Sequence, residues 1–127
     1  MPVFEHGHFD GFTNGGWVIG HFGKGSLKTD DIEIKWAHHD PGPAGKGWSD
    51  CDTATTLSVL ISGRFNIEFR HNLEAMPTAV LLEQQGDYVM FGPGIQHQST
   101  ALEPSLFLTI RWPSRAGDCQ AVERNGL

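Results

Sequence analysis

The chain has 127 residues, a length that favours one compact domain, because two domains would each be short of core. Nine Lys and Arg residues against fifteen Asp and Glu residues give a formal net charge of −6 with neutral His, the wrong sign for binding phosphate backbones. No apolar run comes near the roughly 18 residues that span a bilayer, and the N-terminus does not resemble a secretory signal. We therefore expect a cytoplasmic protein that binds neither nucleic acid nor membranes.

Cys51 and Cys119 are the two cysteines of the chain. They are too few for a disulfide scaffold, and their spacing matches neither CxxC nor a zinc pattern. For a cytoplasmic protein we expect both to be reduced thiols.

Patterns of period two predict eight strands, rich in β-branched and aromatic residues. In chain order they are Trp17–Phe22, Asp31–His39, Thr55–Ser62, Arg64–Arg70, Ala79–Gln84, Asp87–Phe91, His97–Leu102 and Ser105–Trp112. Gly- and Pro-rich segments separate them, and the longest, Pro41–Trp48, is interpreted as a connection. No segment of ten or more residues has helical periodicity. The pattern predicts an all-β fold, with a barrel at about 17–112, an N-terminal arm at 1–16 and a polar C-terminal tail at 113–127.

His38 and His39 end the second predicted strand, and alternation places them on opposite faces. The apolar residues of this strand share the face of His38; they are Ile32, Ile34 and Trp36. The charged residues share the face of His39; they are Glu33 and Lys35. An apolar interior favours His38 as the inward residue, whereas a β-bulge near Pro41 would turn His39 inward instead.

The segment Gly86–His97 contains a Gly92-Pro93-Gly94 turn, which reverses the chain and places His97 at the start of the next strand. This segment resembles the second motif of the cupin family: a glycine, five residues, Pro-x-Gly, two residues and a histidine. Gly92 stands where the pattern has proline. The resemblance implies an antiparallel double-stranded β-helix, or jelly-roll barrel, in which His97 is a metal ligand.

The first cupin motif, HxH, three or four residues, Glu, six residues and Gly, resembles this sequence only in its scaffold. When its glycine is aligned with Gly63, its glutamate position falls on Thr56. The two histidine positions fall on Asp50 and Asp52, or with the looser spacing on Ser49 and Cys51. None of the three usual ligands of this motif is kept.

A rebuilt metal site is nevertheless one hypothesis. Its candidate ligands are His97, His38, His39, Asp50 and Asp52. Mixed imidazole and carboxylate ligands suit a divalent ion such as Mn, Fe, Zn or Ni. Fewer imidazoles than usual should hold such an ion less tightly.

Arg64 and Arg111 complete the candidate pocket with His97, His38 and His39, because a strand guanidinium can bind the carboxylate of a ligand. Three functions remain open: a small-molecule-binding barrel with a degenerate metal site, a metal-dependent oxygenase or isomerase acting on a small polar substrate, and a purely structural barrel. We favour the first, and we expect a homodimer because a small barrel leaves sheet edges and apolar surface to cover.

Overall fold

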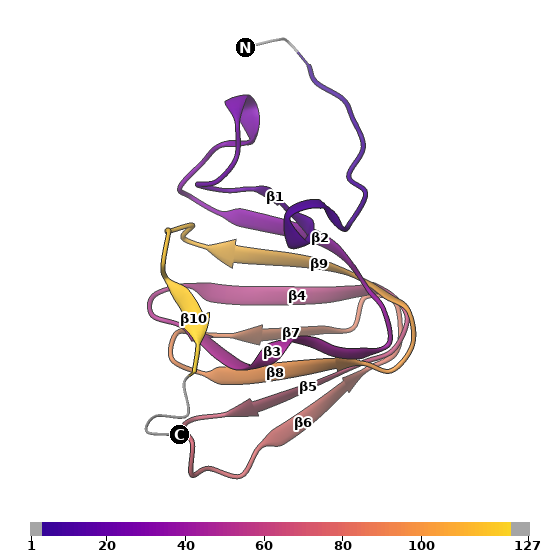
Figure 1. Cartoon of the computed structure of the whole chain (residues 1–127), viewed down its shortest axis with the longest axis vertical. Helices are drawn as coiled ribbons and strands as arrows, with labels where there is room; N and C mark the ends of the chain where they lie inside the picture. Colours follow the sequence, from indigo (N-terminus) through magenta and orange to yellow (C-terminus); the bar gives the residue numbers. More distant parts are fainter. Residues whose placement is uncertain (1–3, 123–127) are drawn as a thin grey trace.

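The computed structural model describes residues 4–122. The chain folds into two antiparallel five-stranded sheets (Figure 1). The first sheet has the order β1-β2-β9-β4-β7 and the second the order β10-β3-β8-β5-β6. The strands of the first sheet are β1 (Trp17–Ile19), β2 (Glu33–His39), β9 (Ser105–Trp112), β4 (Thr55–Ser62) and β7 (Tyr88–Phe91). Those of the second are β10 (Cys119–Ala121), β3 (Gly42–Cys51), β8 (Gln96–Ala101), β5 (Phe65–Arg70) and β6 (Thr78–Leu82). Two short 3-10 turns, Thr13–Gly16 and Gly25–Leu27, flank β1, so the predicted all-β jelly-roll class is confirmed.

All eight expected strands are present, and two further strands, β3 and β10, were not predicted. The interpretation of Pro41–Trp48 as a connection is wrong, since β3 pairs with β8 from Gly42 to Ala44 and again at Ser49. The ladder is irregular between these stretches, where Gly45 and Gly47 have positive φ. Gly and Pro have low strand propensity, so the sequence does not indicate this strand. It forms because it pairs with β8, which is distant in sequence. Within the expected C-terminal tail, β10 pairs with the end of β3.

Gly63, the glycine of the first motif, makes the turn between β4 and β5 with a φ of +104°. A Cβ here would lie 2.6 Å from the backbone oxygen of Pro104, so both the dihedral angle and the available space require glycine. The turn takes the chain from β4 in the first sheet to β5 in the second.

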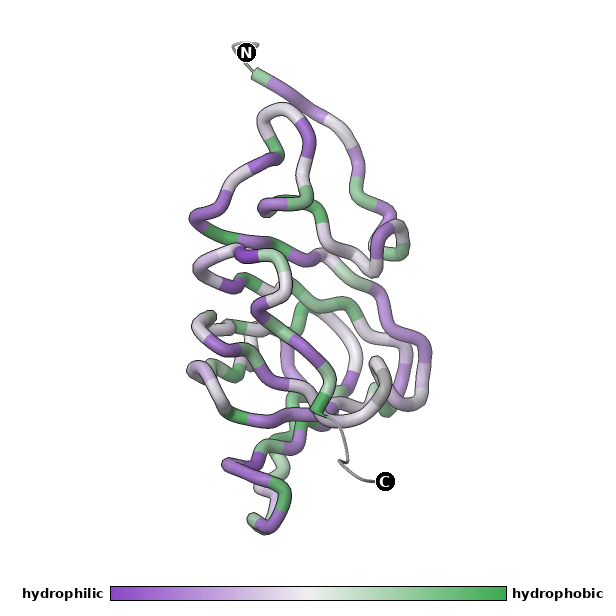
Figure 2. The backbone as a smooth tube through the Cα atoms, turned by 60° about the vertical axis from the view of Figure 1, so that its left-hand side comes forward, coloured by the Kyte–Doolittle hydropathy of each residue, from purple (hydrophilic) through white to green (hydrophobic). Residues whose placement is uncertain are grey.

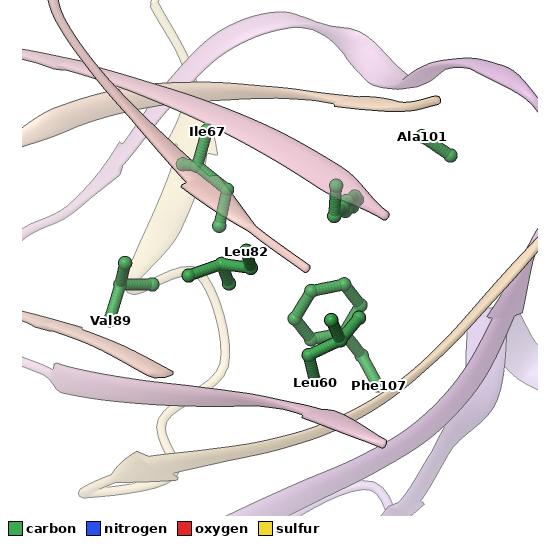
Figure 3. Packing of buried hydrophobic residues seen from close by; sticks show 7 residues of the cluster. Leu60, Ile67, Leu82, Val89, Ala101 and Phe107 are labelled. Carbon is green, nitrogen blue, oxygen red and sulfur yellow. The ribbon is translucent and has the colours of Figure 1, made fainter. Parts of the chain in front are cut away.

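The hydrophobic core fills one end of the space between the sheets (Figure 3). Its buried members are Leu60, Phe65, Ile67, Leu82, Val89, Ala101 and Phe107. Figure 2 shows hydrophobic and hydrophilic residues interleaved along the chain, as expected when alternate residues of each strand face opposite sides. The core does not extend along the whole interior, and the other end contains a cavity lined by both aromatic and polar residues.

The interior face of β2 is the charged one, so the preference for His38 as the inward residue is wrong. Glu33 and Ala37 are buried, and His39 faces the interior, whereas His38 is exposed. The pairing of β2 with β9 is continuous, and no bulge is involved. The outer face is instead covered by the segment 11–16: the amide of His38 donates to the Gly11 carbonyl at 3.0 Å, and Phe12 stacks on the His38 ring. Apolar residues can therefore face outward on this strand.

Cys51 and Cys119 form a disulfide, so the expectation of two reduced thiols is wrong. The two residues are directly opposite each other in the β3–β10 pair, at a sequence separation of 68. The bond attaches β10 to the second sheet. Among residues 4–122, no helix has the length and apolar character needed to cross a membrane.

Candidate functional site

A cavity of about 320 Å³ lies at the polar end of the interior, and both sheets contribute to its walls. Aromatic side chains form much of the lining: Trp17, Trp48, Phe65, Phe91 and Phe107. Polar side chains point in between them: Lys35, His39, Ser49, Thr56, Ser58, His97, Gln98, Ser99, Thr109 and Arg111. A concave site with an aromatic wall and a few convergent polar groups is the usual form of a small-molecule site.

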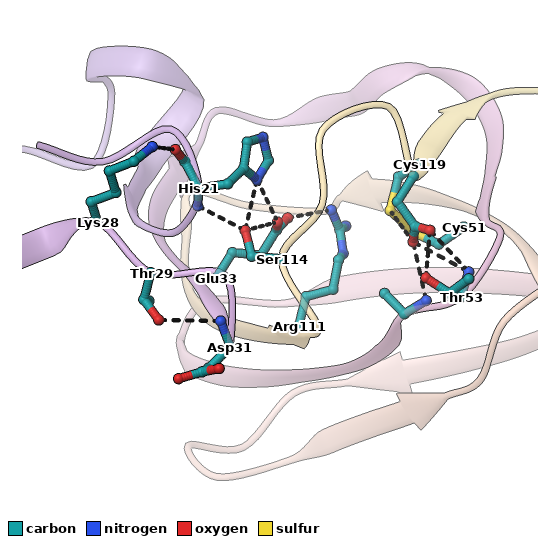
Figure 4. A network of polar contacts seen from close by, with 12 residues as sticks. His21, Lys28, Thr29, Asp31, Glu33, Cys51, Thr53, Arg111, Ser114 and Cys119 are labelled. Carbon is teal, nitrogen blue, oxygen red and sulfur yellow. Dashed lines mark hydrogen bonds and ion pairs between the residues drawn. A yellow bond between two sulfur atoms is a disulfide. The ribbon is translucent and has the colours of Figure 1, made fainter.

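Arg111 on β9 is held in place by Glu33, its neighbour on β2 (Figure 4). The guanidinium Nη1 donates to Glu33 Oε2 at 3.0 Å, and both side chains are mostly buried. The Ser114 hydroxyl donates to the other carboxylate oxygen at 2.7 Å, and His21 Nδ1 lies 3.6 Å from that oxygen. Arg111 Nε also lies 3.4 Å from the Thr56 hydroxyl oxygen, so the guanidinium is anchored at the edge of the cavity.

Lys35 lies two residues from Glu33 on β2 and lines the cavity. Its ammonium lies 5.5 Å from the centre of the Trp17 ring, which also carries Arg111 Cζ at 4.7 Å. Burial, assisted by the nearby Arg111 charge, lowers the pKa of Lys35 to about 8. Within residues 4–122 the ammonium has neither a hydrogen-bond acceptor nor an ion-pair partner.

His97 is the second residue of β8, shortly after the Gly92-Pro93-Gly94 turn, and it lines the cavity. Its Nε2 is 3.4 Å from the Ser49 hydroxyl, and its buried Nδ1 makes no hydrogen bond of normal geometry to the described residues. Burial, followed by the positive charge of Arg111, lowers the pKa of His97 to about 4. The ring is therefore neutral at pH 7 and can accept or donate one hydrogen bond on each side.

His39 lies where the cavity meets the hydrophobic core. Its ring centre is 5.2 Å from that of Phe65 and 6.3 Å from that of Phe107. Burial, with the nearby Lys35 as the next cause, lowers the pKa of His39 to about 4. Both cavity imidazoles are thus uncharged at neutral pH, and Lys35 and Arg111 are the cations of the lining.

The positions of the first cupin motif follow the looser spacing. Ser49 faces the cavity opposite His97, and Cys51, two residues on, is buried in the disulfide. Thr56, at the glutamate position, is 2% exposed. Two hydroxyls, a disulfide sulfur and one imidazole are a poor ligand set for a divalent transition metal, and the Arg111 charge opposes a cation. The residues at this position do not fit the metal that the family resemblance implies.

Four of the expected site residues lie away from the cavity lining. Asp50 and Asp52 accept hydrogen bonds from the Gln120 side chain at 2.8 and 3.3 Å, on the outside of the β3–β10 pair. His38 stacks on Phe12, and Arg64 pairs with Glu83 at 3.6 Å on the surface. His97, His39 and Arg111 are the expected residues that the structure brings together.

One group of three metal-ligating side chains occurs in the described chain, outside the cavity lining. Ligand atoms of Cys51, Asp118 and Cys119 lie within 4.8 Å of one another. The two sulfurs are bonded to each other, and thiolates are the form that binds metals. The Asp118 carboxylate is occupied by Thr53, which donates from its hydroxyl at 2.6 Å and from its amide at 3.1 Å.

Sequence reasoning missed several residues of this site, among them Lys35 in the lining and Glu33, which bonds to Arg111. The alternation in β2 did separate the charged from the apolar residues, but the charged face was taken as the outer one. The signal that could have identified them is the alternation of Glu33 and Lys35 along one face of a barrel strand. Trp17 and Trp48 belong to the same lining, although Trp48 falls in the segment taken as a connection.

The sheet order and the turn before His97 define a double-stranded β-helix barrel, and solved structures share this fold. The chain is similar to KdgF from Halomonas sp., with 23% identity over 68% of this chain and 74% of that chain, at a TM-score of 0.55. It is similar to an uncharacterized conserved protein with a double-stranded β-helix domain from Klebsiella pneumoniae (22% identity, 76% and 78% covered, TM-score 0.56). It also resembles a cupin-2 domain protein from Shewanella frigidimarina (18% identity, 65% and 71% covered, TM-score 0.52). The chain therefore shares the double-stranded β-helix fold of these structures, one of which is a cupin-2 domain protein, and this is the fold that the resemblance to the second motif implied.

Other similar structures are longer than this chain. The match covers 56% of peruvianin-I from Thevetia peruviana latex and 29% of CapF in its complex with 3-isopropenyl-tropolone. No family model and no curated protein matches the sequence. All of the structural likenesses named above are below 25% identity, so they establish the fold and not the chemistry.

Proposed function

We propose that this cupin-fold domain binds a small organic molecule in the cavity between its two sheets, without a metal ion as the anchor. The observation that carries the proposal is the cavity of about 320 Å³, whose aromatic walls enclose Lys35, Arg111 and two neutral imidazoles. A barrel with a purely structural role gains nothing from burying these polar groups, because each loses hydration that protein partners only partly replace.

A fragment screen followed by NMR tests the proposal. With the full chain, we expect amide shifts caused by bound fragments to cluster on cavity residues such as Ser49, Thr109 and His97. Ser58→Phe on β4 fills the cavity and should abolish binding. Ser62→Phe is the matched control, since it makes the same change at the exposed end of the same strand. Binding that survives Ser58→Phe in a folded protein would place the ligand elsewhere.

A metal-dependent oxygenase or isomerase is the second candidate, and His97 at the position of the family's ligand is the observation in its favour. The hydroxyl groups, the disulfide sulfur and the Arg111 cation around this histidine are evidence against a metal-dependent enzyme. Metal analysis of protein purified without an affinity tag decides the matter. Stoichiometric metal that disappears in His97→Ala would reinstate the enzyme hypothesis and overturn the metal-independent proposal.

The homodimer also stays a prediction. The mass of the particle in solution, measured by light scattering, tests it directly.

A further inference from the structure

The cations of the cavity lining differ in their partners. Among the described side chains, the cations Lys35 and Arg111 enter the lining; Glu33 is bonded to Arg111 and Ser114, and the charge of Asp118 also acts on Arg111. The two imidazoles add no charge at pH 7, because the pKa of each is lowered to about 4. Among the described residues, Arg111 therefore has a carboxylate partner and Lys35 has none.

Lys35 is the cation left without a partner in the described chain. Its ammonium faces the Trp17 ring at 5.5 Å and has no hydrogen-bond or ion-pair partner between residues 4 and 122. Buried or partly buried charges are normally paired, because only a counter-charge or hydrogen bonds offset the free energy lost on removal from water. A cation–π contact offsets only a part of this cost. An anion brought by a ligand would supply the missing partner.

We propose that Lys35 and Arg111 form a subsite for the carboxylate of a small organic acid, whose apolar body lies against the aromatic wall of the cavity. This inference rests on the proposed small-molecule function and names the chemical class of the ligand. Both cations lie over the same Trp17 ring, so they approach one region of the cavity. Hydroxyl groups of Thr56 and Thr109 line this region and can donate to a carboxylate oxygen.

The charge and the size of the cavity favour a monocarboxylate over a phosphate. One uncompensated cation matches a single negative charge, whereas a phosphate dianion would remain undercompensated. Phe65, Phe91 and Phe107 continue the lining beyond the cations and provide an apolar surface for the rest of the molecule. The volume of about 320 Å³ is at the small end of ligand pockets, which suits a compact acid.

Benzoate and benzamide test the subsite, since they have nearly the same shape and differ in charge. We expect NMR titration of the full chain to give benzoate a Kd at least about tenfold lower than that of benzamide. Lys35→Met should remove this preference, whereas Arg64→Gln, which deletes a positive charge from the surface, should keep it. The pKa of Lys35, followed through its side-chain resonances, should rise from about 8 when benzoate binds, because the carboxylate stabilises the ammonium.

The outcomes separate the subsite from the proposed function. Equal affinities for the two probes, or a benzoate preference that persists in folded Lys35→Met, would overturn the subsite while cavity binding stands. Inorganic phosphate binding more tightly than benzoate would overturn the choice of a carboxylate. If no fragment of any charge bound in the cavity, the proposed function itself would fail. Thermal unfolding of each variant shows whether a loss of binding reflects a loss of folding.

Discussion

The two ends of the barrel interior are built from the same strands but differ in chemistry. On β4 and β8, Leu60 and Ala101 belong to the hydrophobic core, whereas Thr56 and His97 of the same strands line the cavity. The core end stabilises the fold through apolar burial, and the cavity end contains groups whose burial costs free energy. Because burial of the polar cavity residues does not stabilise the fold, ligand binding is the better explanation for their presence.

Shortening a core side chain should have the largest effect. Leu60 has no exposed surface, so Leu60→Ala should lower the free energy of unfolding by about 2–5 kcal/mol through lost burial and a cavity. Ser58→Ala, two residues away in the cavity lining, removes one hydrogen bond to Thr109 and should cost only about 1 kcal/mol. Urea denaturation of both variants measures the contrast. Equal losses would mean that the two ends contribute alike to stability.

The disulfide should have the next largest effect. Cys51→Ser with Cys119→Ser should lower the free energy of unfolding by about 2–4 kcal/mol, because the bond closes a long loop in the unfolded chain. Urea denaturation of the parent protein with and without a reductant provides the control. A parent protein insensitive to reductant, together with a variant of parental stability, would contradict the contribution of this bond.

Acid should weaken the protein through the buried imidazoles. The native pKa values of His39 and His97 are about 4, below the ordinary value of 6.5, so the unfolded state binds more protons between these pH values. Their contribution to stability is complete above about pH 6.5 and is lost as the pH falls toward 4. For the two residues together, we expect a loss of about 2 kcal/mol between pH 7 and pH 5.5. Replacing both residues by Phe should flatten the profile, and an unchanged slope would refute the assignment.

The smallest effect is expected for Lys35→Met. Because the ammonium is partly buried without a partner, its removal should leave the free energy of unfolding unchanged or raise it by about 1 kcal/mol. Thermal and urea unfolding check the sign. A clear loss of stability would show that Lys35 stabilises the fold, as the residues of the hydrophobic core do.

The sequence identified several residues of the site, including His97, His39 and Arg111, but it did not show which face of β2 points into the barrel. The turn at Gly92-Pro93-Gly94 located His97, and alternation separated His39 from His38. The choice between these two failed because the segment 11–16 covers the outer face of β2, and a contact between such distant segments leaves no periodic signal. The strand β3 was missed for a similar reason: Gly42 and Pro43 pair with β8, and the end of β3 at 49–51 pairs with β10, so its partners are distant in sequence.

By itself, the sequence determined the strands with strong alternation, the glycine turns at Gly63 and Gly92-Pro93-Gly94, and through them the cupin-like barrel. These features are local, because backbone conformation and side-chain alternation depend on neighbouring residues. Only the tertiary structure decided which face of β2 is inside, that Cys51 meets Cys119, and that Lys35 and Arg111 share one cavity. These facts depend on which distant segments come together, and that is set by the packing of the whole chain.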